Sequence, residues 1–312
     1  MEGEWRVAAC TENALTLDHC RLSFDGETWE DEEYILDIQK RLMKEEKNRE
    51  VYLKFSFTSE EGMELFLLAE DVEKCAFTLN GEKVSSEPAD WRVDKCLKAL
   101  PVRCRRGENQ LVVRRMFVNP DRVYYVKNHA MHEAESNRVT VETELEAVYL
   151  WGDFGVYNLG AQADGPRRTA AMEGPFVVGK RPEAVEADRL EAQGFPFFAG
   201  TVALEKTAVL PRADRAVLAF DRPDAIVTGV YVNGSKVKDF CWAPYRADVT
   251  DLVREGENTI RVEITNSCRN LFGPHYSREG ESYAVGPMGF GKDVAHKQFV
   301  RLGVEGLRIE IE

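Results

Sequence analysis

Apolar and polar residues alternate strictly in several short segments of the chain. The alternation is clearest in VYLKFSF, VTVETELE and TIRVEIT, at residues 51–57, 139–146 and 259–265, and in the final residues 307–312. A period of two with one charged face is typical of antiparallel strands that cover a core on one side only. Helical spacing is convincing only over residues 37–46, where Ile38 and Leu42 share a face. The pattern therefore predicts an all-β protein of many short strands, and it favours sandwiches over a barrel enzyme.

The chain also contains an internal repeat. The segment LFLLAEDVEKCAFTLNGEKV, from Leu65, matches VLAFDRPDAIVTGVYVNGSKV, from Val217, with a one-residue gap. In both copies an Asn-Gly pair, at residues 80–81 and 233–234, lies between apolar alternations. Such a pair is the strongest short-range signal of a β-hairpin, so we expect a hairpin in each copy.

The two copies continue in the same order after the hairpin. Gly-Glu-Asn follows at residues 107–109 and 256–258, and a closing strand comes next. A period of about 150 residues indicates two copies of one domain, because solenoid repeats are far shorter. The strand pattern fades between Asn119 and Asn137, so we place the domains at residues 1–137 and 138–312.

The second copy carries a recognisable series of motifs. It reads VNG at residues 232–234, WAPYR at 242–246, DVTD at 248–251 and GEN at 256–258. This series resembles the sugar-binding jelly-roll domain of glycoside hydrolase family 2 and the related galactose-binding-like domains of large bacterial glycosidases. The resemblance implies two tandem antiparallel β-sandwich domains of the jelly-roll, galactose-binding-like type.

Other segments resemble the C-terminal part of such enzymes, including the family 106 rhamnosidases. They are NALTLD at residues 13–18, GDFGV at 152–156, QGFPFFAG at 193–200, and TNS with NLFGPH within 265–275. No strand–helix alternation for a (β/α)8 barrel is present, and such a barrel alone needs about 250 residues. The resemblance therefore implies a chain without the catalytic domain, either a fragment or a free-standing relative.

Composition narrows the choice of partner. Asp and Glu number 54 against 41 Lys and Arg, for a net charge of −13. Such a surface repels phosphate backbones and anionic lipid, so we expect neither nucleic acid nor a membrane as partner. The first ten residues carry charges where an export signal needs an apolar core, and the seven cysteines form no CxxC pair. We therefore expect reduced thiols and a cytoplasmic location.

Catalytic and metal-binding patterns are weak. Glycoside hydrolysis needs two carboxylates about 5–10 Å apart across a cleft, and sequence spacing cannot identify such a pair. Asp153 is the most prominent acid, but we interpret it as a carboxylate hydrogen-bonded to backbone at a strand bend. Asp248 and Asp251 are interpreted as turn and cap residues. No HExxH and no Asp-x-Asp-x-Asp ladder occurs, so we expect no cofactor, with calcium as the alternative.

Two turn-like segments of the second copy carry the densest sets of aromatic and hydrogen-bonding side chains. Sugars bind against flat aromatic faces, and planar amides, carboxylates and Arg bind their hydroxyls. Loops at one end of a sandwich are the usual place for such residues. We therefore predict a ligand-binding set made of Trp242, Tyr245, Arg246, Asn270, His275 and Tyr276.

All members of this set except Asn270 also have a structural interpretation. Trp91 takes the place of Trp242 in the first copy, so the aromatic residues Trp242 and Tyr245 could simply plug the end of the sandwich. The repeat also matches Arg92 and Asp94 with Arg246 and Asp248, which an internal ion pair would explain. For His275 and Tyr276, a packed loop and a partner-facing loop are both open.

The sequence predicts a non-catalytic, carbohydrate-binding pair of sandwich domains from the C-terminal part of a bacterial glycoside hydrolase. The alternative is a structural module that packs on a catalytic barrel and touches no sugar, and a glycosidase in its own right is the third hypothesis. If the aromatic loop binds sugar, Trp242→Ala or Arg246→Ala abolishes binding measured by isothermal titration, whereas Trp91→Ala spares it. Equal binding by a folded Trp242→Ala protein would place the site elsewhere.

Overall fold

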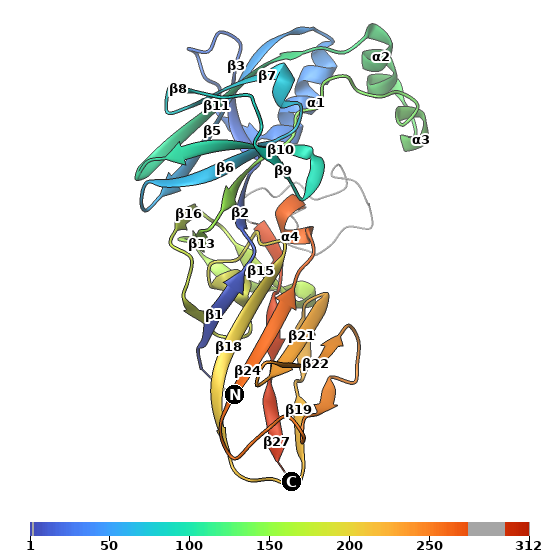
Figure 1. The fold of residues 1–312 in the computed structure, drawn as a ribbon. Coiled ribbons are helices and arrows are strands. Elements are labelled where there is room, and N and C mark those ends of the chain that lie inside the picture. The colour runs from blue at the N-terminus through green and yellow to red at the C-terminus, as the bar shows by residue number, and fades with distance from the viewer. Residues whose placement is uncertain (2, 274–296, 312) are drawn as a thin grey trace. The chain divides into compact units, whose positions relative to one another are not determined.

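The computed structural model describes residues 1, 3–273 and 297–311, and it is mostly β (Figure 1). Strands hold 49% of the residues and helices 13%. The paired strands run antiparallel, and the described residues form several sheets and no barrel. The predicted all-β sandwich fold is confirmed.

The chain divides into two compact units. The middle unit is Leu15–Gly152, and the terminal unit combines Met1–Ala14 with Asp153–Glu312. This division differs from the boundary expected at residue 137. The reason is strand pairing: β1 (Trp5–Cys10) pairs with β18 (Thr201–Leu210), and β12 (Val148–Gly152) pairs with β6 (Met63–Ala69). β1 and β12 are thereby assigned to the unit that the sequence did not suggest for them.

The middle unit contains two main sheets and three helices. Beside β6 and β12, its elements are β2 (Asn13–Leu17), β3 (His19–Ser23), β4 (Glu32–Tyr34), α1 (Ile35–Glu45), β5 (Arg49–Ser59), the 3-10 turn Val72–Lys74, β7 (Cys75–Leu79), β8 (Glu82–Val84), β9 (Asp90–Arg92), β10 (Asp94–Cys104), β11 (Gly107–Phe117), α2 (Asp121–His129) and α3 (Glu133–Ser136). One sheet has the order β2-β12-β6-β10-β9, and the other contains β3, β4, β5, β11, β7 and β8.

The terminal unit is built around a six-stranded sheet of order β17-β1-β18-β24-β21-β22. Beside β1 and β18, its elements are β13 (Gly155–Asn158), β14 (Gln162–Gly165), the 3-10 turn Pro166–Arg168, β15 (Thr169–Met172), β16 (Phe176–Gly179), β17 (Ala184–Val185), the 3-10 turn Leu190–Ala192, β19 (Ala216–Ala219), β20 (Arg222–Asp224), β21 (Val227–Val232), β22 (Ser235–Phe240), β23 (Arg246–Asp248), β24 (Gly256–Thr265), α4 (Arg269–Phe272), β25 (Lys297–Val300), β26 (Gly303–Glu305) and β27 (Arg308–Ile311). A small sheet, β23-β19-β27, contributes to the same hydrophobic core.

The predicted alternation is present in both cores. In β5 the side chains of Val51, Leu53, Phe55 and Phe57 are buried, and in β24 those of Ile260, Val262 and Ile264 are buried. The helix expected over residues 37–46 is α1, whose Ile38 and Leu42 lie in the core. These residues form strands and a helix because each pattern places the apolar side chains on one continuous face, which is buried away from water when the chain folds.

One predicted strand is absent. Residues 139–146 alternate in burial, with Thr143 and Leu145 buried, but they pair with no strand among the described residues. Their backbone amides bond to side chains instead: Asn119 Oδ1 accepts from Glu142 at 2.8 Å, and Gln39 Oε1 accepts from Leu145. The backbone requirement for partners is met without a sheet, so alternation alone was insufficient.

Both predicted Asn-Gly hairpins are confirmed. Asn80 and Gly81 join β7 to β8, and Asn233 and Gly234 join β21 to β22. The φ angles are 54° and 84° in the first pair and 51° and 82° in the second. Two successive residues in the left-handed region make the turn whose twist matches the flanking strands, and Asn followed by Gly tolerates it best.

A pair of asparagines ties each hairpin to the closing strand of its unit. In the terminal unit, Asn233 Nδ2 donates to Asn258 Oδ1 at 2.8 Å, and Asn258 Nδ2 donates to the carbonyls of Arg254 (2.8 Å) and Gly256 (2.9 Å). Asn233 Oδ1 in turn accepts from the amide of Thr259 at 3.0 Å. We call this arrangement the Asn–Asn lock.

The middle unit repeats the lock with nearly equal distances. Asn80 Nδ2 donates to Asn109 Oδ1 at 2.9 Å, and Asn109 Nδ2 donates to the carbonyls of Arg105 (2.8 Å) and Gly107 (3.0 Å). Asn109 and Asn258 are both buried. The repeat in sequence is therefore a repeat of one hydrogen-bonded framework.

We expect Asn109→Ala and Asn258→Ala each to lower the free energy of unfolding of its own unit by about 2–4 kcal/mol. Each substitution leaves buried backbone groups without partners, and one such group costs about 1–3 kcal/mol. Urea denaturation followed by circular dichroism measures the loss, with Gln110→Ala as an exposed neighbouring control. A loss below about 1 kcal/mol for either asparagine would show that the lock is dispensable.

Candidate functional site

The aromatic loop between β22 and β23 presents one ring to solvent. Trp242 is 77% exposed, so it does not plug the end of the sandwich. Tyr245 takes that structural role instead: its ring stacks on Phe220, with centroids 5.2 Å apart, and it packs against the core. Of the two aromatic residues predicted here, only Trp242 is therefore open to a ligand.

Arg246 and Asp248 do not pair with each other. The Arg246 guanidinium binds the carboxylate of Glu310 on β27, and Asp248 Oδ1 accepts from the backbone amide (3.0 Å) and the hydroxyl (2.6 Å) of Thr250. Hydrogen bonds from the Thr250 side chain and backbone hold the pKa of Asp248 below its usual range. Arg246 therefore forms an internal ion pair, but with Glu310 and not with Asp248, and the interpretation of Asp248 as a turn residue is confirmed.

Asn270 is a structural residue. It is fully buried on α4, where its Nδ2 donates to the carbonyl of Val300 and its Oδ1 accepts from the amide of Val300, both at 2.9 Å. His275 and Tyr276 lie outside the described residues. The structure thus uses Asn270 to hold α4 against β25 and gives no view of the remaining two predicted residues.

A hollow lined by polar and charged side chains lies on the outer face of the six-stranded sheet. It has a volume of about 520 Å³ and is lined by Glu205, Tyr231, Asn233, Gly234, Arg254, Thr259, Arg261 and Glu263. All of these residues belong to the terminal unit. We call this feature the Tyr231 hollow.

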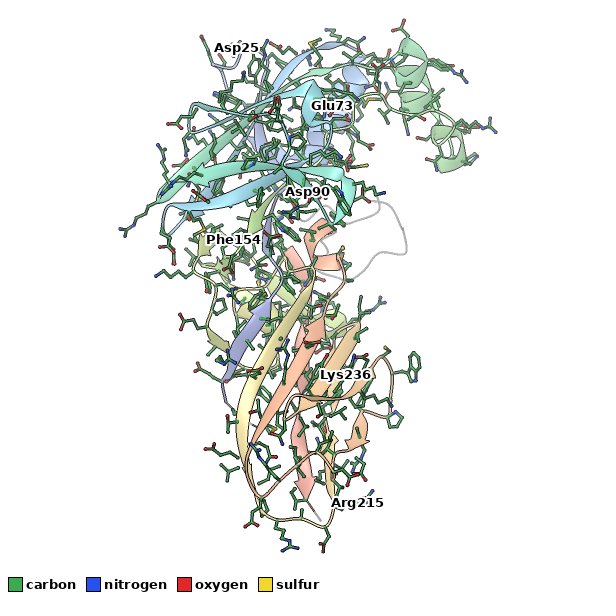
Figure 2. All side chains as sticks on the ribbon, in the orientation of Figure 1. Asp25, Glu73, Asp90, Phe154, Arg215 and Lys236 are labelled. Atoms are coloured by element: carbon green, nitrogen blue, oxygen red, sulfur yellow. The ribbon has the colours of Figure 1, made fainter. Side chains whose placement is uncertain are left out.

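Strand register sets the middle of the Tyr231 hollow. Arg261 on β24 lies opposite Glu205 on β18 and opposite Tyr231 on β21, so the three side chains share one row of the outer face. Lys236 on β22, labelled in Figure 2, extends that row, and its ammonium lies 5.8 Å from the Tyr231 ring centroid. The aromatic ring is therefore flanked by two cations.

Glu263 links the ring and the guanidinium. Its Oε2 accepts from Tyr231 Oη at 3.1 Å, and its Oε1 accepts from Arg261 Nη2 at 2.7 Å and from Nε at 3.2 Å. The hydrogen bond to Glu263 raises the pKa of Tyr231, so the phenol keeps its proton near neutral pH. Arg261 Nη1 also lies 3.5 Å from Glu205 Oε1. These contacts fix the side chains before any ligand arrives.

The matching positions of the middle unit carry different side chains. Aligning the two locks places Thr78 at the position of Tyr231, two residues before the asparagine of each hairpin. It likewise places Val112 at the position of Arg261, three residues after the second asparagine. The framework is shared, but these two positions differ, and the middle unit has a tyrosine–glutamate–arginine group of its own elsewhere on its outer face, made of Tyr52, Glu50 and Arg114. A position-by-position comparison of the two repeats would have identified Tyr231 and Arg261 from the sequence. The alternating pattern alone indicates only a charged, solvated face.

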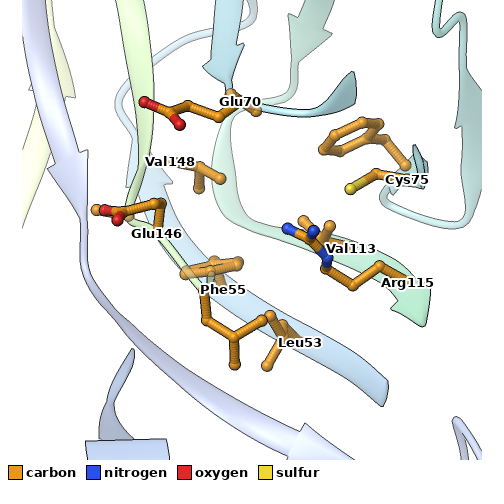
Figure 3. Close-up of a pocket in the computed structure, with 12 residues that line it drawn as sticks. Leu53, Phe55, Glu70, Cys75, Val113, Arg115, Glu146 and Val148 are labelled. Atoms are coloured by element: carbon orange, nitrogen blue, oxygen red, sulfur yellow. The ribbon is translucent and has the colours of Figure 1, made fainter. Parts of the chain in front are cut away.

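The middle unit contains a small pocket of about 30 Å³ (Figure 3). Buried Arg115 lines it; its Nη1 donates to the carbonyl of Glu144 at 3.1 Å, and its Nη2 lies 3.4 Å from Asp71. Cys75 lines it too, and burial raises the pKa of this thiol. The volume suits one water molecule and excludes a sugar ring.

The remaining acids and thiols show no assembled catalytic or metal centre within the described residues. The exposed carboxylate of Asp153 accepts from Arg181 Nε at 2.5 Å, so an ion pair replaces the backbone contact expected there. No group of three His, Cys, Asp or Glu residues in the described part of the chain could hold a metal ion. The seven cysteines are free, and none of the described helices is long and apolar enough to cross a membrane.

Comparison with known proteins finds local similarities to glycosidases. No protein-family model matches the chain. A Formosa agariphila protein, whose name marks it as an inferred β-glucuronidase, is 33% identical over 85 residues. That match covers 26% of this chain, and the chain spans 7% of the relative.

Solved rhamnosidase structures are also among the matches. One from Novosphingobium sp. PP1Y is 18% identical, with 70% of this chain and 19% of that chain covered and a TM-score of 0.26. An α-L-rhamnosidase from Streptomyces avermitilis is 12% identical, with 84% and 25% covered and a TM-score of 0.32.

Trp242 is exposed and Asn270 is buried, so we expect substitutions of the two residues to affect the free energy of unfolding very differently. Trp242→Ala removes an exposed ring and should change the free energy of unfolding by less than about 0.5 kcal/mol. Asn270→Ala leaves the amide and carbonyl of Val300 without partners and should cost about 1–3 kcal/mol. Thermal and urea denaturation of the two variants checks this. A larger loss for Trp242→Ala than for Asn270→Ala would contradict the assignment.

Proposed function

We propose that this chain is a non-catalytic, carbohydrate-binding pair of β-sandwich domains associated with a bacterial glycoside hydrolase, and that sugar binds in the Tyr231 hollow. The observation that carries the proposal is the composition of the hollow: one tyrosine ring set among fixed carboxylates and a guanidinium on an open sheet face. A flat ring binds the C–H face of a sugar, and charged planar groups bind hydroxyls. The local similarity to an inferred β-glucuronidase supports the glycosidase context.

Ion pairing in the hollow favours binding over hydrolysis. Arg261 contacts both Glu263 and Glu205, so each carboxylate has a cationic partner. A glycosidase needs one carboxyl group that keeps its proton to protonate the leaving oxygen. Both carboxylates of the hollow are instead tied to Arg261, in an arrangement that suits hydrogen bonding to the hydroxyl groups of a ligand.

Trp242 offers a second contact region. Its exposed ring on the β22–β23 loop has the chemistry of a sugar platform, although Tyr245 and Arg246 beside it are engaged in packing and ion pairing. We propose a catalytic glycosidase domain as the protein partner and a cytoplasmic location, the latter supported by the free thiols. A purely structural module remains the rival function.

We expect Tyr231→Ala to weaken oligosaccharide binding by at least about tenfold, because ring stacking and the buried area of the ring together exceed about 1.4 kcal/mol. Isothermal titration of the intact chain against a panel of plant and mucin oligosaccharides measures the loss. Thr78→Ala, at the matching position of the middle unit, is the control and should bind as the parent does.

The panel also separates the alternatives. Loss of binding in a folded Trp242→Ala protein, with Tyr231→Ala unaffected, would move the site to the aromatic loop. Failure of the parent chain to bind any oligosaccharide would favour the structural module. Turnover of chromogenic glycosides, abolished by Asp153→Asn, would make the chain an enzyme.

A further inference from the structure

We propose that the Tyr231 hollow selects an acidic sugar, one that bears a carboxylate such as a uronic acid residue, and that Arg254 binds that carboxylate. This inference rests on the proposed carbohydrate-binding function and names the substrate class of the same site. It follows from the charges that line the hollow, from the way Arg254 is held, and from the presence of Arg254 and the tyrosine ring in one hollow.

The carboxylates of the hollow are already neutralised. Glu263 accepts hydrogen bonds from Arg261 and Tyr231, and Glu205 contacts both Arg261 and Arg6. Arg254 differs from these groups: no carboxylate in the described part of the chain forms an ion pair with it. The charge left open to a ligand in the hollow is therefore positive.

The Arg254 side chain is held in place by its own loop. Its Nε donates to the carbonyl of Glu257 at 2.9 Å, and its backbone amide donates to Asn258 Oδ1 at 2.9 Å. Because Nε is occupied, the edge formed by Nη1 and Nη2 remains for a ligand. Two parallel N–H groups on that edge match the two oxygens of a planar carboxylate. A guanidinium that is already fixed also loses little conformational entropy on binding.

The tyrosine ring and the open arginine line one hollow. Tyr231 and Arg254 both border the volume of about 520 Å³. Tyr231 lies opposite Arg261 on the sheet, and Arg254 lies in the loop that leads into β24. A sugar ring stacked on Tyr231 therefore shares the hollow with the Nη1–Nη2 edge of Arg254, which can bind its carboxylate.

A phosphate-bearing ligand fits less well. Glu205 and Glu263 line the same hollow, and the whole chain carries a net charge of −13. A phosphate monoester brings up to two negative charges, and the single open arginine balances only one of them, whereas a single carboxylate is matched by that arginine. The charge pattern thus favours a monoanionic sugar.

The middle unit supplies a matched control. Arg105 is held in the same way, with Nε donating to the carbonyl of Glu108 at 3.0 Å and the backbone amide donating to Asn109 Oδ1 at 2.9 Å. The face beside it carries Thr78 and Val112 in place of the ring and the guanidinium. Substitution of Arg105 removes the same local contacts as substitution of Arg254 and leaves the Tyr231 hollow intact.

The test is isothermal titration of the intact chain with uronic acid tetrasaccharides, of both galacturonic and glucuronic type, and with the same oligosaccharides after reduction of their carboxyl groups to alcohols. The parent should bind one or both acidic forms at least about tenfold more tightly than the reduced forms, because a guanidinium forms two charge-assisted hydrogen bonds with a carboxylate. Arg254→Gln should abolish that preference and leave the affinity for the reduced form unchanged. Arg105→Gln should keep the preference.

The outcomes separate this inference from the proposed function. Equal affinity for acidic and reduced forms, or an acid preference that survives Arg254→Gln, overturns the inference while sugar binding stands. Loss of the preference in Arg105→Gln also overturns it, because the effect would then be a general consequence of loosening the loop. Absence of binding to either form overturns the carbohydrate-binding function, and the inference with it.

Discussion

The Asn–Asn lock is the constraint on which the rest of each unit depends. One asparagine ends the first strand of the hairpin, and the other opens the closing strand, so their hydrogen bond sets the register between them. A shift of one residue would turn every buried side chain of the closing strand toward solvent. In the terminal unit the same register places Tyr231 opposite Arg261. The core and the Tyr231 hollow are therefore two consequences of one interaction, on opposite faces of one sheet.

The internal repeat separates framework from function. Matching hydrogen bonds in both units hold the Asn-Gly turn, the buried asparagine and an arginine whose Nε donates to the carbonyl of the residue directly before that asparagine. The aligned exposed positions are not shared: Thr78 and Val112 in one unit correspond to Tyr231 and Arg261 in the other. Residues that both copies keep serve the fold. In the terminal unit one of them, Arg254, also lines the hollow beside Tyr231 and Arg261, and the Nη1–Nη2 edge of its guanidinium is left for a ligand.

The sequence predicts what is local and misses what depends on distant partners. Alternation in β5 and β24, the hairpins and α1 follow from patterns within a few residues. The strand expected at residues 139–146 fails because the side chains of Asn119 and Gln39 take its amides. Asn270 resembles a ligand-binding amide in sequence, yet the backbone of Val300 uses both of its polar ends. The hollow needs the register of β18, β21 and β24 together, which no single segment contains.

The central claim is that sugar binds on the outer sheet face of the terminal unit, with its acidic group at Arg254. A crystal structure of the chain with a bound uronic acid tetrasaccharide tests this most directly. The account predicts a sugar ring stacked on Tyr231 and a carboxylate within hydrogen-bond distance of Arg254 Nη1 and Nη2. A ligand bound at the Trp242 loop or on the middle unit, with the Tyr231 hollow empty, would contradict it.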